Sequence, residues 1–261
     1  MNALRAYPTL LRVGFAGALA YRAELIIWML TTTMPLVSLA LWSAVSRNAP
    51  LGRFGPTEFV GYFLAALIVR QITGCWLVWE LNYEIKQGTL SQKLLKPIHP
   101  LWVFSASNLA ALPLRAGLCL PVVIVAIVYS QLTSNPSLLA IFLFSLVGAW
   151  CINFFAMALV GSLAFFLESS TGVFELWLIT FMVLSGYVVP LELFPSWARD
   201  IANALPFRYT LGFPVEVITG MLDVSTALQM LMRQWIYAAL MATAGLLAFR
   251  AGVRRFGAFG G

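Results

Sequence analysis

Six stretches of mainly apolar residues constrain this chain more than any other feature. A helix needs about 20 apolar residues to cross about 30 Å of hydrocarbon. The stretches cover residues 25–45, 59–79, 108–129, 138–167, 174–189 and a last one between 228 and 251 that starts near Trp235. Because lipid offers the backbone no hydrogen bonds and the stretches lack strand-like alternation, each is predicted to be a helix. The fourth is longer than a span requires, which predicts that it tilts or projects from the membrane.

The composition agrees with a membrane protein and excludes a soluble domain. Of the 261 residues, 61% are hydrophobic and 10% are charged, and the mean hydropathy is +0.88. A soluble domain has about 45–50% apolar and about 25% charged residues. The first apolar stretch starts too late and runs too long to be an export signal, and no small-residue cleavage site ends it. We therefore expect a single all-α integral membrane domain over residues 1–261.

The basic residues predict that both termini are cytoplasmic, because lysine and arginine in short loops stay on the inner side. With the termini inside, nine basic residues are inner: Arg5, Arg12, Arg22, Lys86, Lys93, Lys96, Arg250, Arg254 and Arg255. Five are outer: Arg47, Arg53, Arg199, Arg208 and Arg233. The net charge of +6 then reflects topology and contact with anionic membrane lipids. No basic face remains that would favour binding of nucleic acid.

Residues 1–23 are predicted to form a helix that lies on the inner membrane surface. Apolar side chains at positions 4, 10, 11, 15 and 19 alternate with arginines at positions 5, 12 and 22. This pattern is typical of an interfacial amphipathic helix. A loosely ordered basic leader is the alternative.

The polar segment 84–100 between the second and third spans has the features of a docking element. Glu80 and Glu84 are four residues apart and share a helix face, and Gly88 permits a sharp turn of the backbone. A short helix over residues 89–95 should follow this turn.

Leu90, Leu94 and Leu95 are predicted to give this short helix one apolar side, and Pro97 and Pro100 to stop it. A small amphipathic helix fixed at both ends suits transmission of a push from a soluble partner. An interfacial helix that only anchors the loop is the alternative.

Polar groups inside spans are costly in lipid, so each is a functional candidate. Arg70 lies near the middle of the second span, with Gln71 and Thr73 beside it. It either contacts a substrate or locks two helices of one subunit together. Arg115 is expected to meet headgroups or backbone carbonyls, and Asn153 to join helices by a hydrogen bond.

Several kinds of chemistry find no support in the sequence. The three cysteines show no CxxC spacing, and the single histidine, His99, has no second ligand nearby, so no metal site is predicted. Without a G-x-x-x-x-G-K-[ST] loop, the chain does not handle a nucleotide in the P-loop manner. No G-x-S-x-G elbow or pair of intramembrane carboxylates supports an enzyme. No ring of charges supports a self-sufficient ion channel.

Two motifs resemble those of permease subunits of ABC exporters of the second type, which include the daunorubicin and polysaccharide exporter permeases. The first, E-I-x-x-G-T-L then L-x-P, is matched by Glu84, Ile85, Gly88, Thr89, Leu90, Leu95 and Pro97. The second, an outer hairpin before the last span, is matched by Gly186, Pro190, Phe194, Pro195, Trp197, Leu205, Pro206, Phe207, Pro214 and Gly220. The tail from Arg254 to Gly261 resembles a subgroup of small permeases that often work beside a second, non-identical permease.

The resemblance implies a helical exporter with six spans, both termini cytoplasmic and a re-entrant outer hairpin at residues 190–221. It implies that Glu84, Gly88, Thr89, Leu90, Leu94, Leu95 and Pro97 belong to a coupling helix that seats in the ATPase. The translocation path would include Arg70, Gln71, Thr73, Glu175, Thr180 and Ser185, with Glu175 as the partner of Arg70. The hairpin would supply an outer gate from Pro190, Phe194, Trp197, Pro206 and Phe207; a cap that merely fills the outer leaflet is the alternative.

The sequence thus predicts a multi-pass permease subunit in a bacterial cytoplasmic membrane that moves a lipophilic, amphipathic or glycan-type substrate outward. The chain itself would bind no cofactor, and ATP and Mg²⁺ would bind to cytoplasmic ABC ATPase subunits. ATP binding would push the coupling helices and tilt the second and fifth spans. A second permease, identical or not, would complete the pore. The alternative is a non-transporting membrane scaffold that recruits an ATPase to act on a protein partner.

Overall fold

The computed structural model describes residues 3–129, 132–167 and 169–256, and within these ranges the chain is helical and forms no strand. The helices are α1 (Ala3–Ala20), α2 (Arg22–Leu30), α3 (Met34–Ser46), α4 (Pro56–Thr73), α5 (Leu77–Lys86), α6 (Leu90–Leu94), α7 (Pro100–Ala110), α8 (Leu112–Tyr129), α9 (Pro136–Ser162), α10 (Thr171–Leu184), α11 (Ser196–Asn203), α12 (Phe207–Thr210), α13 (Gly212–Ile218) and α14 (Val224–Val253). Two 3₁₀ turns, η1 (Leu163–Phe165) and η2 (Leu191–Leu193), complete them. The all-α class is as predicted, whereas most of the tail motif lies outside the described residues.

Five helical segments of the described chain are long and apolar enough to cross a membrane: Arg22–Ser46, Pro56–Lys86, Pro100–Tyr129, Pro136–Phe165 and Val224–Val253. The predicted span at 174–189 corresponds to α10, which has only 14 residues. At about 1.5 Å per residue it is about 21 Å long, less than the thickness of the hydrocarbon layer.

The first predicted span is two helices, α2 and α3, rather than one. The hydroxyls of residues 31–33 each donate to the carbonyl oxygen three residues earlier, at 2.7, 2.8 and 2.9 Å. Pro35 follows in the first turn of α3. Side-chain hydrogen bonds of this kind bend helices, and a proline there cannot continue the preceding turn. Together they interrupt the span.

The third predicted span starts well before residue 108, because α7 begins at Pro100. His99 caps it, since its Nδ1 accepts a hydrogen bond from the backbone N–H of Leu101 at 3.3 Å. The chain then breaks at Ala111 between α7 and α8. Pro113 lies just beyond this break and has no N–H to continue the helical ladder.

The last span is also longer than predicted. Helix α14 begins at Val224 rather than near Trp235. The carboxylate of Asp223 accepts hydrogen bonds from the backbone N–H groups of Ser225 at 3.0 Å and Thr226 at 3.2 Å. An aspartate in this position is a strong N-cap, and it sets the start of the helix.

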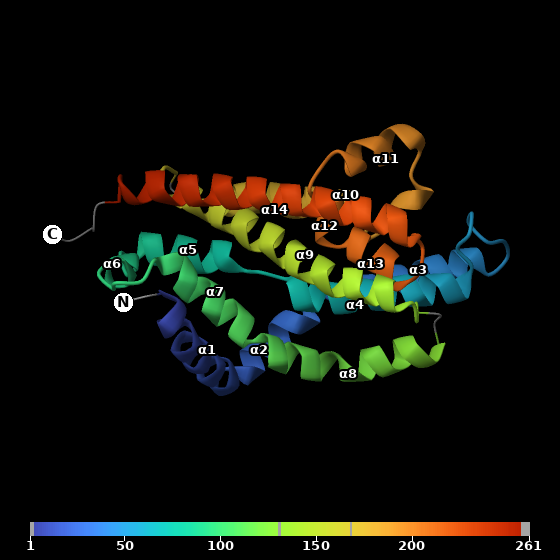
Figure 1. Ribbon diagram of the computed structural model, residues 1–261, viewed down its shortest axis with the longest axis horizontal. Helices are drawn as coiled ribbons and strands as arrows, with labels where there is room; N and C mark the ends of the chain where they lie inside the picture. Colours follow the sequence, from blue (N-terminus) through green and yellow to red (C-terminus); the bar gives the residue numbers. More distant parts are fainter. Residues whose placement is uncertain (1–2, 130–131, 168, 257–261) are drawn as a thin grey trace.

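The long helices α9 and α14 run side by side along the long axis of the molecule (Figure 1). Their backbones approach closely, since a Cβ placed on Gly245 would lie 2.7 Å from the carbonyl oxygen of Phe155. The start of α1, helix α6 and the end of α14 lie at one end of the molecule (Figure 1). The connection between α3 and α4 lies at the opposite end.

The segment Pro56–Lys86, which comprises α4 and α5, is the most buried of the long ones, with 72% of its most apolar stretch inside the protein. Helix α1 packs on α7, and its start lies at the same end of the molecule as α6 (Figure 1). Tyr7 Oη and Ser105 Oγ are 3.1 Å apart, and a Cβ on Gly14 would lie 2.9 Å from Ala110 Cβ. Residues 3–20 of the predicted interfacial helix are thus helical as α1, and residues 22 and 23 already belong to α2.

Candidate functional site

The most buried span is broken at residues 74–76, between α4 and α5. A break inside a membrane helix frees backbone carbonyls, which other groups must then satisfy. Asn153 on α9 donates its Nδ2 to the carbonyl oxygen of Thr73 at 3.1 Å, and Arg115 on α8 donates to the carbonyl oxygen of Gly74 at 3.1 Å. Asn153 thus joins helices, and Arg115 meets a backbone carbonyl, as the sequence predicted.

Arg70 lies in the last turn of α4, directly above this break. Its guanidinium carbon is 4.7 Å from the ring centroid of Phe181 and 5.5 Å from that of Trp76, which is the geometry of cation–π contacts. The predicted partner, Glu175, is exposed on α10. No ion pair in the described part of the chain joins Glu175 to Arg70. Helix α10 turns Phe181, rather than its carboxylate, toward the arginine.

Gln71 is buried and ties α4 to the break in the first span. Its Nε2 donates to Thr32 Oγ1 at 2.7 Å and to the carbonyl oxygen of Met29 at 3.2 Å. The backbone carbonyl of Thr32 in turn accepts the hydroxyl of Tyr187 at 3.0 Å. The interruptions of the two spans are therefore linked by side chains.

The remaining predicted path residues do not line the cavity that Arg70 and Gln71 share. The hydroxyls of Thr73 and Thr180 each donate to a carbonyl four residues earlier in their own helix, both at 2.8 Å. Ser185 is buried at the end of α10, where its carbonyl oxygen lies against the backbone of Gly212. The structure thus gathers two of the six predicted path residues at one site.

That site is a cavity of 660 Å³ beside the break. It is lined by residues of α1, α2, α5 and α7 and by Arg70, Gln71 and Arg115. Most of the remaining lining is apolar or aromatic, including Trp28 and Trp76, whose ring centroids are 5.7 Å apart.

The predicted docking segment forms a short helix, α6, after a sharp turn. Gly88 has φ +70°, a conformation that favours glycine, and α6 follows at Leu90–Leu94. Lys93 points inward, toward the end of α5. Its Nζ is 2.5 Å from Glu84 Oε1 and 3.4 Å from Glu80 Oε1, and it lies 3.8 Å from the ring centroid of Phe104.

The leucines of α6 do not share one apolar side, contrary to the prediction. Leu90 is fully buried and Leu94 is half-buried, whereas Leu95 is 87% exposed. The α6 helix ends at Leu94, so the chain beyond it turns Leu95 outward. Thr89 and Pro97 are exposed as well. Leu90 and Lys93 anchor one side of the segment to the protein, and Leu95 is exposed on the other side.

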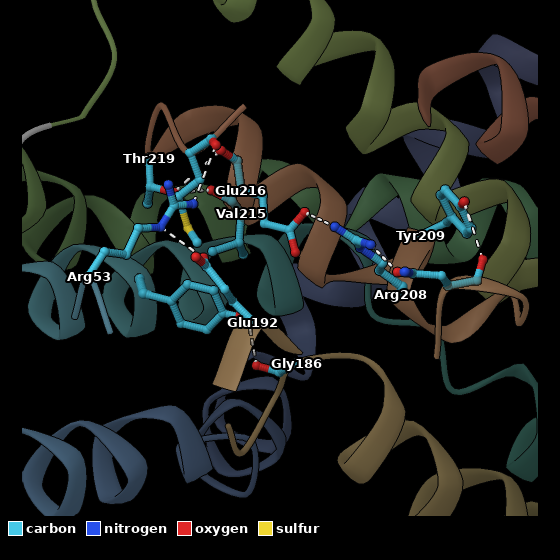
Figure 2. A network of polar contacts seen from close by, with 11 residues as sticks. Arg53, Gly186, Glu192, Arg208, Tyr209, Val215, Glu216 and Thr219 are labelled. Atoms are coloured by element: carbon cyan, nitrogen blue, oxygen red, sulfur yellow. Dashed lines mark hydrogen bonds and ion pairs between the residues drawn. The ribbon is translucent and has the colours of Figure 1, made fainter. Parts of the chain in front are cut away.

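The predicted outer hairpin contains η2, α11, α12 and α13, and ion pairs hold it. Arg208 on α12 lies 2.6 Å from Glu216 on α13 and also donates to the side chain of Asn203 (Figure 2). Near the start of α4, Arg53 contacts Glu192 at 2.8 Å (Figure 2). Figure 2 shows both pairs within one network of polar contacts.

A further contact fixes the chain between α10 and the hairpin. The buried hydroxyl of Tyr62 donates to the carbonyl oxygen of Gly186 at 2.9 Å. Gly186 has φ +85°, and a Cβ there would lie 2.4 Å from the Tyr62 hydroxyl. This position therefore requires glycine for both conformation and space.

The predicted gate residues differ in exposure. Pro190, Pro206 and Phe207 are buried, and the Phe207 ring centroid lies 4.6 Å from that of Trp177 on α10. Phe194 is half-buried, and Trp197 on α11 is 68% exposed. Most of the hairpin is thus packed against the helices, and α11 is its protruding part.

Sequence reasoning missed the break at residues 74–76 and the pairing of Arg208 with Glu216. The polar run from Arg70 to Gly74 is a signal for the break, because it interrupts an apolar stretch with a glycine at its end. Glu216, alone among apolar neighbours, is a similar signal that a cation lies nearby.

These helices define a multi-pass membrane protein whose most buried span is broken between α4 and α5 and is followed by the short polar segment with α6. The chain belongs to the family described as ABC-2 family transporter protein, whose match covers residues 27–260. It is therefore an ABC permease, a membrane component of transport, and this family implies partnership with an ABC ATPase subunit. No curated protein and no solved structure matches the chain.

Proposed function

We propose that the chain is the permease subunit of an ATP-driven exporter and that α6 is its docking element for the ATPase. The observation that carries this proposal is the position of Leu95, which is 87% exposed at the tip of a segment whose other side is anchored. An exposed apolar side chain on an anchored segment is free to fill a pocket of a partner protein, where its burial from water would stabilise the contact. In this arrangement the end with α6, the start of α1 and the end of α14 faces the cytoplasm, and α10 is a short sixth span.

The ties between α6 and α5 support a transmission role. Lys93 joins α6 to Glu84 on α5, so a displacement of α6 would carry α5 with it. Helix α5 meets α4 at the break, where few backbone hydrogen bonds resist a change of angle. A push from the ATPase would therefore change the angle of α5 and reshape the cavity beside Arg70.

The remaining parts of the proposal concern the substrate and the assembly. An apolar cavity with a few polar groups suits a lipophilic or amphipathic substrate. The exposed α11, with Trp197 and Ile201 outward, suits a hairpin that lies in the outer leaflet and gates the exit. A second permease, identical or not, would complete the path in a bacterial cytoplasmic membrane.

Co-purification tests the docking role. The wild-type chain and Leu95→Asp are purified with the ABC ATPase that accompanies the wild type, and bound ATPase and ATP hydrolysis are measured. The matched control is Ile201→Asp on α11, because Ile201 is also apolar and exposed, at 48%. Both substitutions add one charge outside the packed core, and Ile201 lies on the hairpin, away from the proposed docking segment.

We expect Leu95→Asp to lose most of the bound ATPase, with the ATP hydrolysis of the complex, and Ile201→Asp to retain both. Unchanged association and hydrolysis in Leu95→Asp would contradict the docking role. Hydrolysis stimulated only by another protein, and by no amphiphile, would instead support the membrane scaffold.

A further inference from the structure

The cavity beside the α4–α5 break combines two cations with apolar walls. Arg70 and Arg115 both line it, and each is fixed near the break, Arg70 in the turn above and Arg115 through Gly74. We propose that this cavity binds the phosphate-bearing head of a single-chain or double-chain amphiphile, with the apolar chain lying along α1 and α2. Its volume of 660 Å³ lies within the range of about 300–1,000 Å³ typical of small-molecule sites.

The two guanidinium groups retain hydrogen-bonding capacity for an anion. Each guanidinium carries five N–H donors. Arg115 uses NH1 on the carbonyl oxygen of Gly74, and Arg70 bonds the hydroxyl of Tyr187, so each retains further donors. Within the described residues neither arginine has an acidic side chain at ion-pair distance. Asn108 also lines the cavity, and Trp150 Nε1 occupies its amide oxygen at 2.7 Å, which leaves the amide NH₂ as a further donor. Several donors on the lining of one cavity suit the oxygens of a phosphate.

Two carboxylates line the same cavity, but both have other partners. Glu80 lies 3.4 Å from the Nζ of Lys93, and Glu24 accepts a hydrogen bond from Trp28 Nε1 at 3.3 Å. Glu80 lies on α5, beyond the break as seen from Arg70. The positive charge of the two arginines is therefore not cancelled at the break itself.

The rest of the cavity suits an acyl chain. Its apolar lining comes from α1, α2 and α7 and includes Val13, Leu25, Trp28, Val103 and Phe104. Helix α2 has no buried residue, so its other face is open to the lipid. An amphiphile in this position would keep its head near the arginines and its chain next to the membrane. A free inorganic anion would gain nothing from these apolar walls.

This site requires no ATPase, so its test does not depend on the proposed function. The purified full chain is titrated in detergent with lysophosphatidic acid that carries a brominated acyl chain. Bromine quenches the fluorescence of the tryptophans that line the cavity, at positions 28, 76 and 79. The brominated monoacylglycerol of the same chain length is the neutral probe, and inorganic phosphate is the competitor.

The variants separate head recognition from chain binding. Arg70→Gln and Arg115→Gln each remove one cation, and Arg53→Gln removes a cation far from the cavity as the matched control. Gly17→Phe blocks the cavity without changing its charge, because Gly17 lines it and has open space around its Cβ position. Melting temperatures confirm that each variant is folded.

We expect saturable quenching by the phosphate probe, at least tenfold weaker in Arg70→Gln, Arg115→Gln and Gly17→Phe, and unchanged in Arg53→Gln. Equal affinity for the neutral probe would overturn the proposal, as would unchanged affinity in folded arginine variants. If those variants do not fold, unchanged binding in Gly17→Phe overturns it. Displacement of the probe by inorganic phosphate at equal concentration would show a site for the free anion instead.

Discussion

At the scale of single residues, Arg208 and Glu216 place opposite charges where little water remains. Their side chains are 15% and 6% exposed, and 2.6 Å separates them. Breaking a buried pair leaves one charge without compensation and costs about 3–5 kcal/mol. We expect Glu216→Gln to lower the free energy of unfolding by about this amount, measured by denaturant unfolding in detergent.

The matched control for this pair lies on the same face of the molecule. Arg53 and Glu192 are 46% and 42% exposed, and such pairs contribute about 0–1 kcal/mol. Arg53→Gln should therefore change the stability little. A loss in Arg53→Gln as large as that in Glu216→Gln would contradict the difference in burial.

His99, which caps α7, links stability to pH. Burial lowers the pKa of His99 below its ordinary value. Between the folded pKa and the ordinary value of about 6.5, the unfolded chain binds more protons than the folded one. The stability is then full above about pH 6.5 and decreases as the pH falls through that value toward the folded pKa.

We expect the wild type to melt at a lower temperature at pH 5.5 than at pH 7.5. His99→Asn, which keeps a capping side chain without a titrating ring, should lose part of this difference. Because His99 is the only histidine, the NMR titration of its ring reports the pKa directly. A ring that titrates above its ordinary pKa would refute the argument.

At the scale of helices, the contact between α9 and α14 depends on a small residue. A Cβ on Gly245 would lie 2.7 Å from the carbonyl oxygen of Phe155, so a methyl group must push the helices apart. Gly117 on α8 has nothing within 4 Å of its Cβ position. We expect Gly245→Ala to destabilise the protein by about 1–3 kcal/mol through overpacking. Gly117→Ala should be neutral or stabilising by up to about 1 kcal/mol. Similar melting temperatures for the two variants would contradict this packing.

The elements that the sequence predicts best are those set by apolar length alone. The positions of five membrane-length helices follow from apolar runs, and the turn at Gly88 follows from a glycine between polar residues. The break at residues 74–76 depends on partners from other helices, such as Asn153, which a single run of sequence does not contain. The break at residues 31–33 depends on local threonines and on Pro35, which a search for apolar length alone does not detect.

The same limit applies to the candidate site. The importance of Arg70 follows from its depth in an apolar run, because any such charge is costly in lipid. The surroundings of Arg70 do not follow from the sequence, since Phe181 reaches it from a helix more than a hundred residues later in the chain. Lys93 illustrates the converse case. A lysine in a polar loop is expected to face water, but two carboxylates and a phenyl ring draw it inward.

At the scale of the whole molecule, the docking helix, the break and the hairpin lie one after another along the long axis. Helix α6 lies at one end, the break between α4 and α5 follows, and the hairpin with α11 lies toward the other end (Figure 1). The cavity lies beside the break. Helix α5 connects the break directly to the segment with α6. A force applied at α6 therefore reaches the cavity through one helix.

Site-specific photo-crosslinking tests directly whether α6 contacts the ATPase. The photoreactive residue p-benzoylphenylalanine replaces Leu95 in one variant and Ile201 in the other, and each is irradiated in membranes with the ABC ATPase present. Both positions are exposed and apolar, at opposite parts of the molecule. We expect a crosslink to the ATPase from position 95 and none from position 201. A crosslink from position 201, or none from position 95 in a complex that still contains the ATPase, would contradict the docking role of α6.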